Sequence, residues 1–390
     1  MLQPEKACFL IADISGYTEY LAMVEIDHAQ DILADLISTV VTALRPNFRL
    51  SKLEGDAAFC FAPADKVDAS TLLDTIERCY FGFRRRRRDV RQATSCECNA
   101  CIRIPNLNLK FVAHHGMAIR QKIAGREELL GSDVITVHRL LKNDIVSELR
   151  IPAYAAFTDK LVDAMEIDPE KLGMRRHSET YEHLGEVGIW VHDLERRWQE
   201  EDARERVMVT PEAAIFEMSA DVAAPPQVVW EFATTPGRRL QWQAVGGITG
   251  VEQQVGASGR RGVGTVNHCM HGPNVVVEKI LDWRPFDYYT YRSTMPGGAP
   301  TLTTTFTFEP TATGTRVRLL IGKPSKKSEI PIMEQLKPMF EQSMLASIEE
   351  LKTLASQEAT DRSGGPQPAL PAPRNSDGFL EKIKPIQYVG

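Results

Sequence analysis

The sequence predicts an α+β protein with two domains joined by a charged segment. In the first half, short apolar strands such as Ala7–Ala12 alternate with long helical patterns, the first of which stops at Pro46. The second half contains a series of short strands followed by a long amphipathic helix. Between the halves, residues 196–211 are highly charged and lack a long apolar face, so we expect a helical linker there.

Length and composition are those of a globular protein. The 390 residues are 43% hydrophobic and 25% charged, which is enough chain for two or three domains, each with its own core. The net charge of −6 argues against a general nucleic-acid binder, and no apolar run reaches the roughly 18–20 residues that span a bilayer. Because there is also no signal-peptide pattern and the seven cysteines do not resemble a disulfide framework, we expect a cytoplasmic protein.

Two aspartates follow apolar strands near the start of the chain. Asp13 ends the strand Ala7–Ala12, and Asp56 lies in the turn between the strands Phe48–Leu53 and Ala57–Phe61. A hairpin beside the first strand would bring both carboxylates to one edge of a sheet. Mg²⁺ prefers such oxygen ligands and shares its coordination sphere with substrate phosphates. Two aspartates at sheet edges also arise by chance, so this pattern alone leaves a metal site and an ordinary surface both open.

Six motifs in order resemble those of the class III nucleotide cyclases. They are Asp13–Thr18 (DISGYT), Lys52–Asp56 (KLEGD), Ala113–Gly116 (AHHG), Glu128–Gly131 (ELLG), Ser132–Leu140 (SDVITVHRL) and His183–Val187 (HLGEV). The resemblance extends to a bacterial cyclase-like subgroup known only as a domain of unknown function. It implies a cyclase-like, ferredoxin-like domain over residues 1–195.

The resemblance also implies a reaction, in which ATP or another nucleotide is cyclised, with ATP giving 3′,5′-cyclic AMP and pyrophosphate. Two Mg²⁺ or Mn²⁺ ions would be held by Asp13, Asp56 and the main-chain carbonyl of Ile14. In the family, the metal-binding aspartates and the arginine that stabilises the transition state come from different chains, so we expect a homodimer.

Four further positions of the family pattern decide between two functions. Lys52 and Glu128 match the purine-selecting pair, and Lys52 favours ATP over GTP, whereas Glu128 replaces the usual aspartate. Arg139 matches the transition-state arginine, but Ile135 stands where the family has an asparagine that orients the ribose. The chain is therefore either an adenylate cyclase or a catalytically silent cyclase-fold module that binds a nucleotide or a partner.

A cluster of thiols follows the first long helices. Cys96, Cys98 and Cys101 form a C-x-C-x-x-C pattern that can wrap one soft metal ion. The candidates for a fourth ligand are Cys79, His114 and His115. Structural Zn²⁺, an iron–sulfur cluster and metal-free thiols all remain open. After this cluster, the strand Leu109–Ala113 is expected to pair with Met117–Ile123, which places the two histidines at a strand end where most histidines are structural.

The second domain, residues 212–355, resembles the START-like (SRPBCC) helix-grip fold. The resemblance rests on Val222–Trp230 (VAAPPQVVW), Trp283–Phe286 (WRPF), the antiparallel strands and the long closing helix. It implies a sheet curled around that helix and an apolar small-molecule ligand that regulates the first domain. Possible lining residues are Trp242, Met270, Tyr289, Tyr291 and Met295, with ordinary core packing as the alternative. The Pro-rich residues 356–390 are expected to be a disordered tail.

Overall fold

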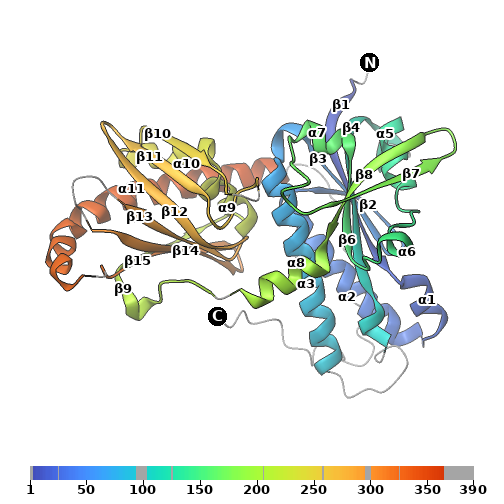
Figure 1. The fold of residues 1–390 in the computed structure, drawn as a ribbon, viewed down its shortest axis with the longest axis horizontal. Helices are drawn as coiled ribbons and strands as arrows, with labels where there is room; N and C mark the ends of the chain where they lie inside the picture. Colours follow the sequence, from blue (N-terminus) through green and yellow to red (C-terminus); the bar gives the residue numbers. More distant parts are fainter. Residues whose placement is uncertain are drawn as a thin grey trace. The chain divides into compact units, whose positions relative to one another are not determined.

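The computed structural model describes residues 3–24, 26–93, 103–123, 126–204, 206–256, 259–294, 300–324 and 326–363, and these form two compact units. The first unit ends at Ala203 and the second begins at Arg204 (Figure 1). The predicted linker over residues 196–211 therefore divides between them, because its first part is the helix α8 (Leu194–Ala203) that completes the first unit. Among the helices described, none combines the length and the apolar character needed to cross a bilayer.

An eight-stranded sheet forms the centre of the first unit. Its order is β2-β3-β1-β4-β6-β8-β7, with β5 paired to β4, and the β4–β6 pair is parallel whereas the other pairs are antiparallel. The strands are β1 (Glu5–Ser15), β2 (Arg49–Glu54), β3 (Ala57–Pro63), β4 (Asn108–Ile123), β5 (Arg126–Leu130), β6 (Tyr154–Thr158), β7 (Arg175–Tyr181) and β8 (Gly185–Asp193). The mixed sheet confirms the predicted α+β class.

Helices cover both faces of this sheet. They are α1 (Tyr17–Ala22), α2 (Ile26–Leu44), α3 (Ala69–Ala93), α5 (Ser132–Arg139), α6 (Ile145–Leu149), α7 (Asp159–Ala164) and α8. Along β1, Leu10 and its even-numbered neighbours pack with α2 and α3, whereas Phe9 and Ile11 pack with α5 and α6. Strands buried on both faces read as continuous apolar runs, which explains the unbroken pattern before Asp13.

The predicted pairing of Leu109–Ala113 with Met117–Ile123 is wrong. Both segments belong to the single long strand β4, whose second part pairs with β5 instead. The chain stays extended through Gly116, which lies within β4. A Cβ atom at this position would lie 2.3–2.5 Å from atoms of the Asp133 side chain. The glycine in this motif therefore provides space for a neighbouring carboxylate and does not form a turn.

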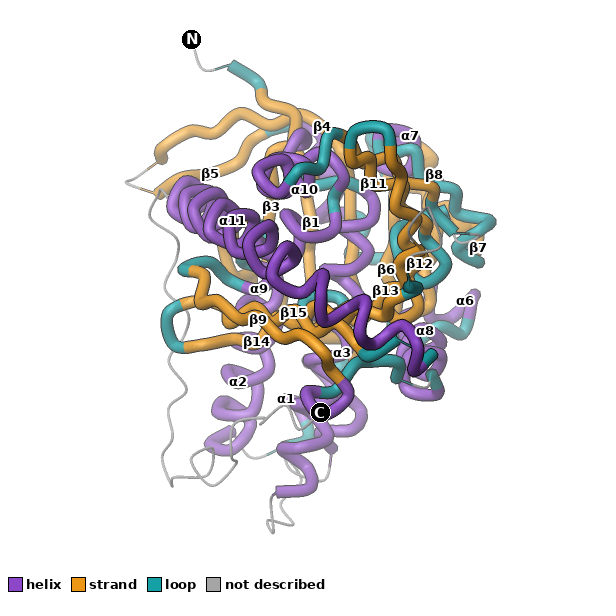
Figure 2. The backbone as a smooth tube through the Cα atoms, turned by 90° about the vertical axis from the view of Figure 1, so that its left-hand side faces the viewer, coloured by secondary structure: helices purple, strands orange, loops and turns teal. Residues whose placement is uncertain are grey.

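The second unit consists of a seven-stranded antiparallel sheet and a long helix, which confirms the predicted helix-grip fold. The sheet order is β10-β11-β12-β13-β14-β15-β9. The strands are β9 (Ala214–Val222), β10 (Gly250–Gln254), β11 (Val266–His271), β12 (Asn274–Arg284), β13 (Tyr288–Thr294), β14 (Leu302–Thr311) and β15 (Gly314–Gly322). The helices are α9 (Pro226–Thr234), α10 (Pro236–Gln243) and α11 (Ile330–Ser363). Figure 2 shows α11 as the longest helix of this unit, running beside α9 and α10.

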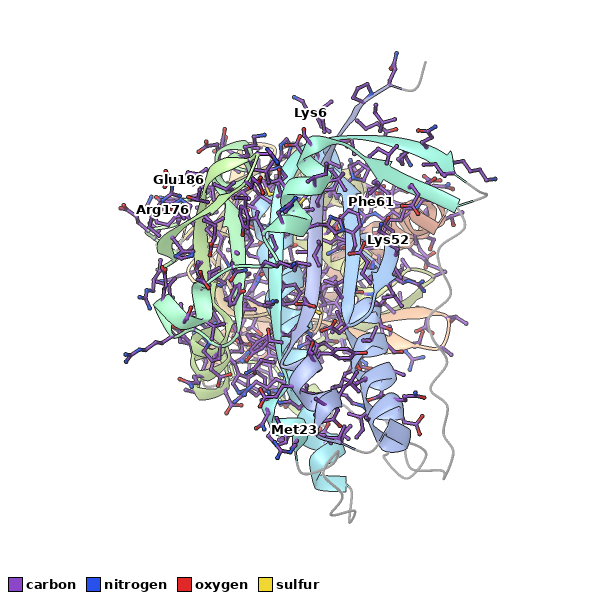
Figure 3. The ribbon with its side chains drawn as sticks, turned by 90° about the vertical axis from the view of Figure 1, so that its right-hand side faces the viewer. Lys6, Met23, Lys52, Phe61, Arg176 and Glu186 are labelled. Carbon is purple, nitrogen blue, oxygen red and sulfur yellow. The ribbon has the colours of Figure 1, made fainter. Side chains whose placement is uncertain are left out.

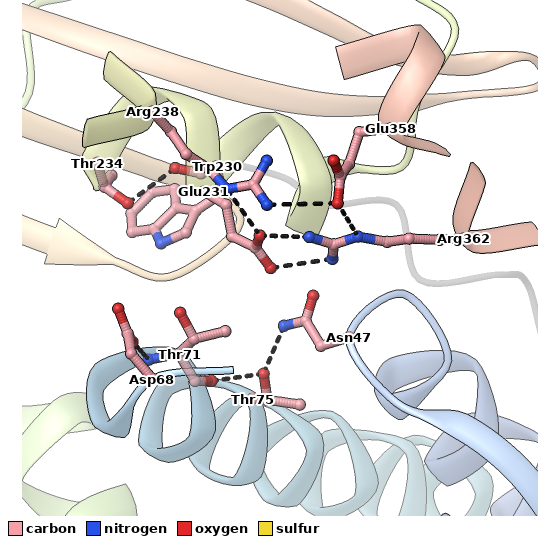
Figure 4. Close-up of polar contacts among 10 residues, drawn as sticks. All are labelled: Asn47, Asp68, Thr71, Thr75, Trp230, Glu231, Thr234, Arg238, Glu358 and Arg362. Carbon is pink, nitrogen blue, oxygen red and sulfur yellow. Dashed lines mark hydrogen bonds and ion pairs between the residues drawn. The ribbon is translucent and has the colours of Figure 1, made fainter. Parts of the chain in front are cut away.

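The closing helix is longer than the sequence indicated, because α11 ends at Ser363 and not at residue 355. Near its end, Arg362 donates hydrogen bonds of 3.0 and 2.6 Å to the buried Glu231 of α9 (Figure 4). Glu358 accepts hydrogen bonds from both Arg238 and Arg362. These pairs fix the last turns of α11, so the first residues assigned to the tail belong to the folded unit.

Candidate functional site

The strand register places Asp13 and Asp56 side by side. Asp13 pairs with Ala57 of β3, the residue that follows Asp56, and the amide of Ile14 donates to the carbonyl oxygen of Asp56 at 3.4 Å. Gly55 precedes Asp56 in the β2–β3 turn and has a φ of 68°, which glycine adopts at little cost. The tight turn thus brings the second carboxylate back to the end of β1, as the sequence predicted.

Burial and a neighbouring carboxylate act in the same direction on the pKa of Asp56, and a nearby lysine opposes them. Burial, with the adjacent Asp13 carboxylate, raises the pKa of Asp56 to about 6. Lys110, which pairs with Asp13 across β1 and β4, places its Nζ 3.0 Å from Asp13 Oδ2 and donates to the Leu141 carbonyl at 3.2 Å. The site therefore combines two carboxyl groups with one fixed ammonium.

The donor set fits a magnesium or manganese ion that arrives with a nucleotide. Mg²⁺ is usually held by one or two carboxylates together with water and substrate phosphates, and Asp13 and Asp56 provide such carboxylates. In the part of the chain that the structure describes, no group of three or more His, Cys, Asp or Glu side chains is placed to hold a metal ion. Further ligands would therefore come from the substrate, from water and from the predicted Ile14 carbonyl.

The second predicted pair, Lys52 and Glu128, also meets in the structure. Lys52 Nζ lies 3.4 Å from Glu128 Oε2 on β5 and 3.2 Å from Glu54 Oε1 on β2, and Figure 3 shows Lys52 on the strand beside that of Phe61. Burial lowers the pKa of Lys52, but the carboxylates of Glu54 and Glu128 outweigh this effect, so the pKa is raised. Glu54 also accepts from His138 of α5 at 3.2 Å, so α5 is attached to the hairpin that carries these groups.

Arg139 and Ile135 lie one turn apart on the exposed side of α5. Ile135 is 57% exposed, and the Arg139 side chain makes no hydrogen bond or ion pair with another described residue. The structure therefore does not bring Arg139 into contact with Asp13 or Asp56 of the same chain. The predicted two-chain site stays a prediction.

His114 occupies a buried structural network. Burial lowers its pKa, so the neutral ring donates from Nε2 to Asp133 (3.1 Å) and accepts at Nδ1 from the Thr158 hydroxyl (2.8 Å). Thr158 in turn caps α7 by accepting from the amide of Leu161. Burial alone would raise the pKa of Asp133. Hydrogen bonds from the Met117 amide, His114 and Lys160 outweigh this effect and lower that pKa to about 2. These bonds join β4, α5 and α7, as expected of a structural histidine.

The predicted thiol site stays a prediction. Cys96, Cys98 and Cys101 lie outside the described residues. Cys79 is fully buried on α3, with its Sγ 3.7 Å from the Val40 carbonyl of α2. Burial raises the pKa of the Cys79 thiol, so metal binding there would require deprotonation in an apolar environment.

The second unit contains a cavity of about 590 Å³ between the sheet, α10 and α11. Trp242, Tyr289 and Tyr291 line it as the sequence suggested, whereas Met270 packs against Gly250, and Met295 lies outside the described residues. The remaining lining is mostly apolar, with a small polar group that includes Arg239 and Glu278. Its size and lining are typical of small-molecule sites.

Sequence reasoning missed Lys110, Glu54 and His138. Each belongs to an element that was expected, and both Glu54 and His138 lie inside quoted motifs. Their roles arise from strand pairing and helix docking, which bring together residues distant in the chain. A lysine in β4 gives no signal of its own until the register sets it opposite Asp13.

Comparison with known proteins identifies relatives of both units. Residues 33–149 match the domain family described as a protein of unknown function (DUF2652), and residues 213–355 match the family described as polyketide cyclase/dehydrase and lipid transport. An uncharacterized protein of Mycobacterium tuberculosis is 36% identical over 163 residues, which are 42% of this chain and 73% of that protein. These matches agree with the predicted cyclase-like subgroup and SRPBCC domain.

Two solved structures show similarity to parts of this chain. The adenylyl cyclase CyaB from P. aeruginosa is 12% identical, with 50% of this chain and 96% of that chain covered and a TM-score of 0.37. A protein from Mesorhizobium loti is 18% identical, with 36% of this chain and 96% of that chain covered and a TM-score of 0.29.

Proposed function

We propose that this chain, which belongs to the same family as the uncharacterized protein of Mycobacterium tuberculosis, is an adenylate cyclase that acts as a homodimer. The observation that carries the proposal is the convergence of two sets of groups on the β2–β3 hairpin. Asp13 and Asp56 meet at its turn, and Lys52 and Glu128 meet on its outer strand. The first set suits the phosphates of a nucleotide and the second suits a base.

In the proposed reaction, the ribose 3′ oxygen forms a bond to the α-phosphorus as the bond to the pyrophosphate oxygen breaks. The 3′ proton passes to water. Asp13 and Asp56 would hold the metal, and a bound Mg²⁺ supplies a lowered pKa for the 3′ hydroxyl and neutralises phosphate charge. Arg139 donates to the phosphoryl oxygens where negative charge develops, and Lys52, held by Glu54 and Glu128, donates to the adenine ring.

Two observations support a site shared between protomers. Arg139 is exposed on α5 and has no partner among the described residues, and Ile135 beside it presents apolar surface to solvent. Met117 and Leu130, at the start of the β4–β5 pairing near α5, are also exposed apolar residues. Apolar surface of this kind around an unused arginine favours a second copy of the chain as its cover.

A second candidate is a catalytically silent module that binds a nucleotide. Ile135 favours it, because an isoleucine cannot donate the hydrogen bond that orients a ribose. Lys110 favours it as well, because its ammonium already occupies one oxygen of Asp13. In either case, we propose that the second unit binds a mostly apolar small molecule in its cavity and regulates the first.

Cyclic AMP formation by purified protein with ATP and Mn²⁺ or Mg²⁺ tests the first candidate, with calorimetric ATP binding measured in parallel. Asp13→Ala and Arg139→Ala homodimers should each be inactive, and their mixture should recover at most about half of the wild-type activity per heterodimer through one intact site. ATP binding that depends on Asp13 without product supports the silent module. Absence of both activity and binding contradicts both candidates.

A further inference from the structure

The polar part of the cavity in the second unit is built around a buried ion pair. Arg239 on α10 is 4% exposed and Glu278 on β12 is 6% exposed. The guanidinium donates two hydrogen bonds to the Glu278 carboxylate, at 2.6 and 2.8 Å. Asn267 adds a third donor to Glu278 at 3.3 Å. The pair has no net charge, and its bidentate geometry compensates for the loss of hydration.

Gln243 completes this group and leaves donors toward the cavity. It follows Arg239 by one turn of α10, and its Oε1 accepts from Arg239 Nε at 2.7 Å. A guanidinium only donates, so the amide orientation is fixed, with its oxygen toward Arg239. Gln243 lines the cavity, and its Nε2 has no hydrogen-bond partner within the described residues. The cavity thus contains N–H groups without acceptors beside a charge-neutral pair.

The other groups near this end are consistent with an uncharged occupant. His271 also lines the cavity, and burial lowers the pKa of its imidazole, so that the ring is neutral at pH 7. The aromatic rings of Trp242, Tyr289 and Phe306 form much of the remaining wall. A ligand carboxylate would have to approach Arg239 beside the carboxylate of Glu278, where like charges repel strongly at low dielectric.

We propose that the cavity takes an uncharged, mainly aromatic or aliphatic molecule whose carbonyl oxygen accepts a hydrogen bond from Gln243 Nε2. This inference rests on the ligand binding proposed above for the second unit and specifies the class of ligand. A carbonyl supplies the missing acceptor without adding charge, and the apolar body buries its surface against the aromatic wall. A fatty acid or another carboxylate of the same size is disfavoured, because the guanidinium of Arg239 is already neutralised by Glu278.

Three matched probes test this inference on the full chain. The first is 6-propionyl-2-(dimethylamino)naphthalene, a neutral ketone whose emission shifts to shorter wavelength in apolar surroundings. The second is the corresponding 2-naphthoate, and the third replaces the propionyl group by propyl. Titration followed by fluorescence at pH 7.5 should show that the ketone binds about tenfold more tightly than either analogue. A carboxylate that binds as tightly as the ketone overturns the inference.

Variants locate the contact. Gln243→Leu should weaken ketone binding about tenfold and leave the propyl probe unchanged, whereas the exposed Gln254→Leu should affect neither probe. Glu278→Gln leaves the Arg239 cation without its anion, so it should shift the preference toward the naphthoate. If that variant fails to fold, Gln243→Leu still decides the matter, because equal losses for ketone and propyl probes contradict a hydrogen bond.

The outcomes separate this inference from the function on which it rests. Equal binding of all three probes supports an apolar ligand site and overturns only the carbonyl requirement. No binding of any probe contradicts both the ligand class and the proposed ligand binding of the second unit. The cyclase proposal is tested independently through Asp13 and Arg139.

Discussion

Asp13 and Asp56 are neighbouring carboxyl groups that differ in their partners. Asp13 has the Lys110 ammonium at 3.0 Å, whereas burial and the Asp13 charge raise the pKa of Asp56 from an ordinary value of 3.8 to about 6. Because the folded state holds the Asp56 proton more tightly than the unfolded chain does, this residue lowers stability as pH rises from about 4 to 6. The metal-free site is therefore under electrostatic strain at neutral pH.

Asp56→Asn should relieve that strain. We expect the free energy of unfolding to increase by about 1 kcal/mol at pH 8, a value reduced for solvent screening because the group is half-buried. At pH 5, which lies between the pKa values of the unfolded and folded states, only about half of this gain should remain. Urea unfolding at both pH values measures the difference.

Asp13→Asn is the matched control for this experiment, because it removes the partner of Lys110 and should destabilise the protein at pH 8. A gain from Asp56→Asn that is equal at pH 5 and pH 8 would contradict the assigned cause.

Ile135 is the residue at which the chain departs most clearly from the cyclase pattern. Its side chain is 57% exposed on α5, so an asparagine fits there without repacking. If the chain is a cyclase, Ile135→Asn should raise kcat about tenfold or more by positioning the ribose. Cyclic AMP formation measures this, with Val146→Asn on α6, another exposed apolar residue, as the control. An unchanged or lower kcat would mean that the ribose is held by other groups.

At the scale of elements, β4 is the strand on which the first unit depends most. It pairs with β1, β5 and β6, and its His114 contacts α5 through Asp133 and α7 through Thr158. Gly116 permits this arrangement because no Cβ atom fits beside Asp133. The strand therefore carries a spatial requirement that its own sequence pattern does not reveal.

Gly116→Ala should destabilise the protein by about 1–3 kcal/mol, because the added methyl group overlaps the Asp133 side chain. Gly82→Ala on α3 is the control: nothing lies within 4 Å of its Cβ position, and alanine favours a helix, so stability should rise by about 0.5–1 kcal/mol. Urea unfolding distinguishes the two. A loss at Gly116 no larger than the change at Gly82 would show that Asp133 can move aside.

Elements with strong local patterns were predictable from the sequence, and those set by distant contacts were not. The apolar run of β1 and the periodicity of α2 are properties of the local chain. In contrast, β10 (GVEQQ) and α10 (PGRRLQWQ) are short and polar, so their sequences give little signal. For the same reason, the motifs identified Asp13, Asp56, Lys52 and Glu128, whereas Lys110 became visible only through the β1–β4 register.

At the scale of the molecule, each unit has its own core, and α11 closes the second one. The predicted end at residue 355 omits Arg362, the partner of the buried Glu231. A fragment of residues 204–363 should fold independently and bind the ketone probe. A fragment of residues 204–355 should be less stable by at least about 1 kcal/mol, because the buried Glu231 loses its hydrogen bonds from Arg362. The loss is limited because Arg238 remains 3.8 Å from Glu231.

Thermal and urea unfolding of the two fragments measure this difference. Arg362→Met in the longer fragment should reproduce most of the loss, and the exposed Thr360→Met should not. Equal stability of both fragments would show that the last turns of α11 do not contribute to the fold.

Successive residues of β1 point alternately to the two helical layers, so the position of Asp13 in the strand determines which layer its side chain faces. Odd-numbered residues of this strand face α5, and even-numbered ones face α2 and α3. Substitutions between Phe9 and Asp13 leave the direction of the Asp13 side chain unchanged, whereas inserting or deleting one residue there would turn the carboxylate toward the opposite layer, away from Lys110. Relatives that keep this site must therefore tolerate changes of residue type in β1 far better than changes of its length, and only changes by two residues would preserve the side on which Asp13 lies.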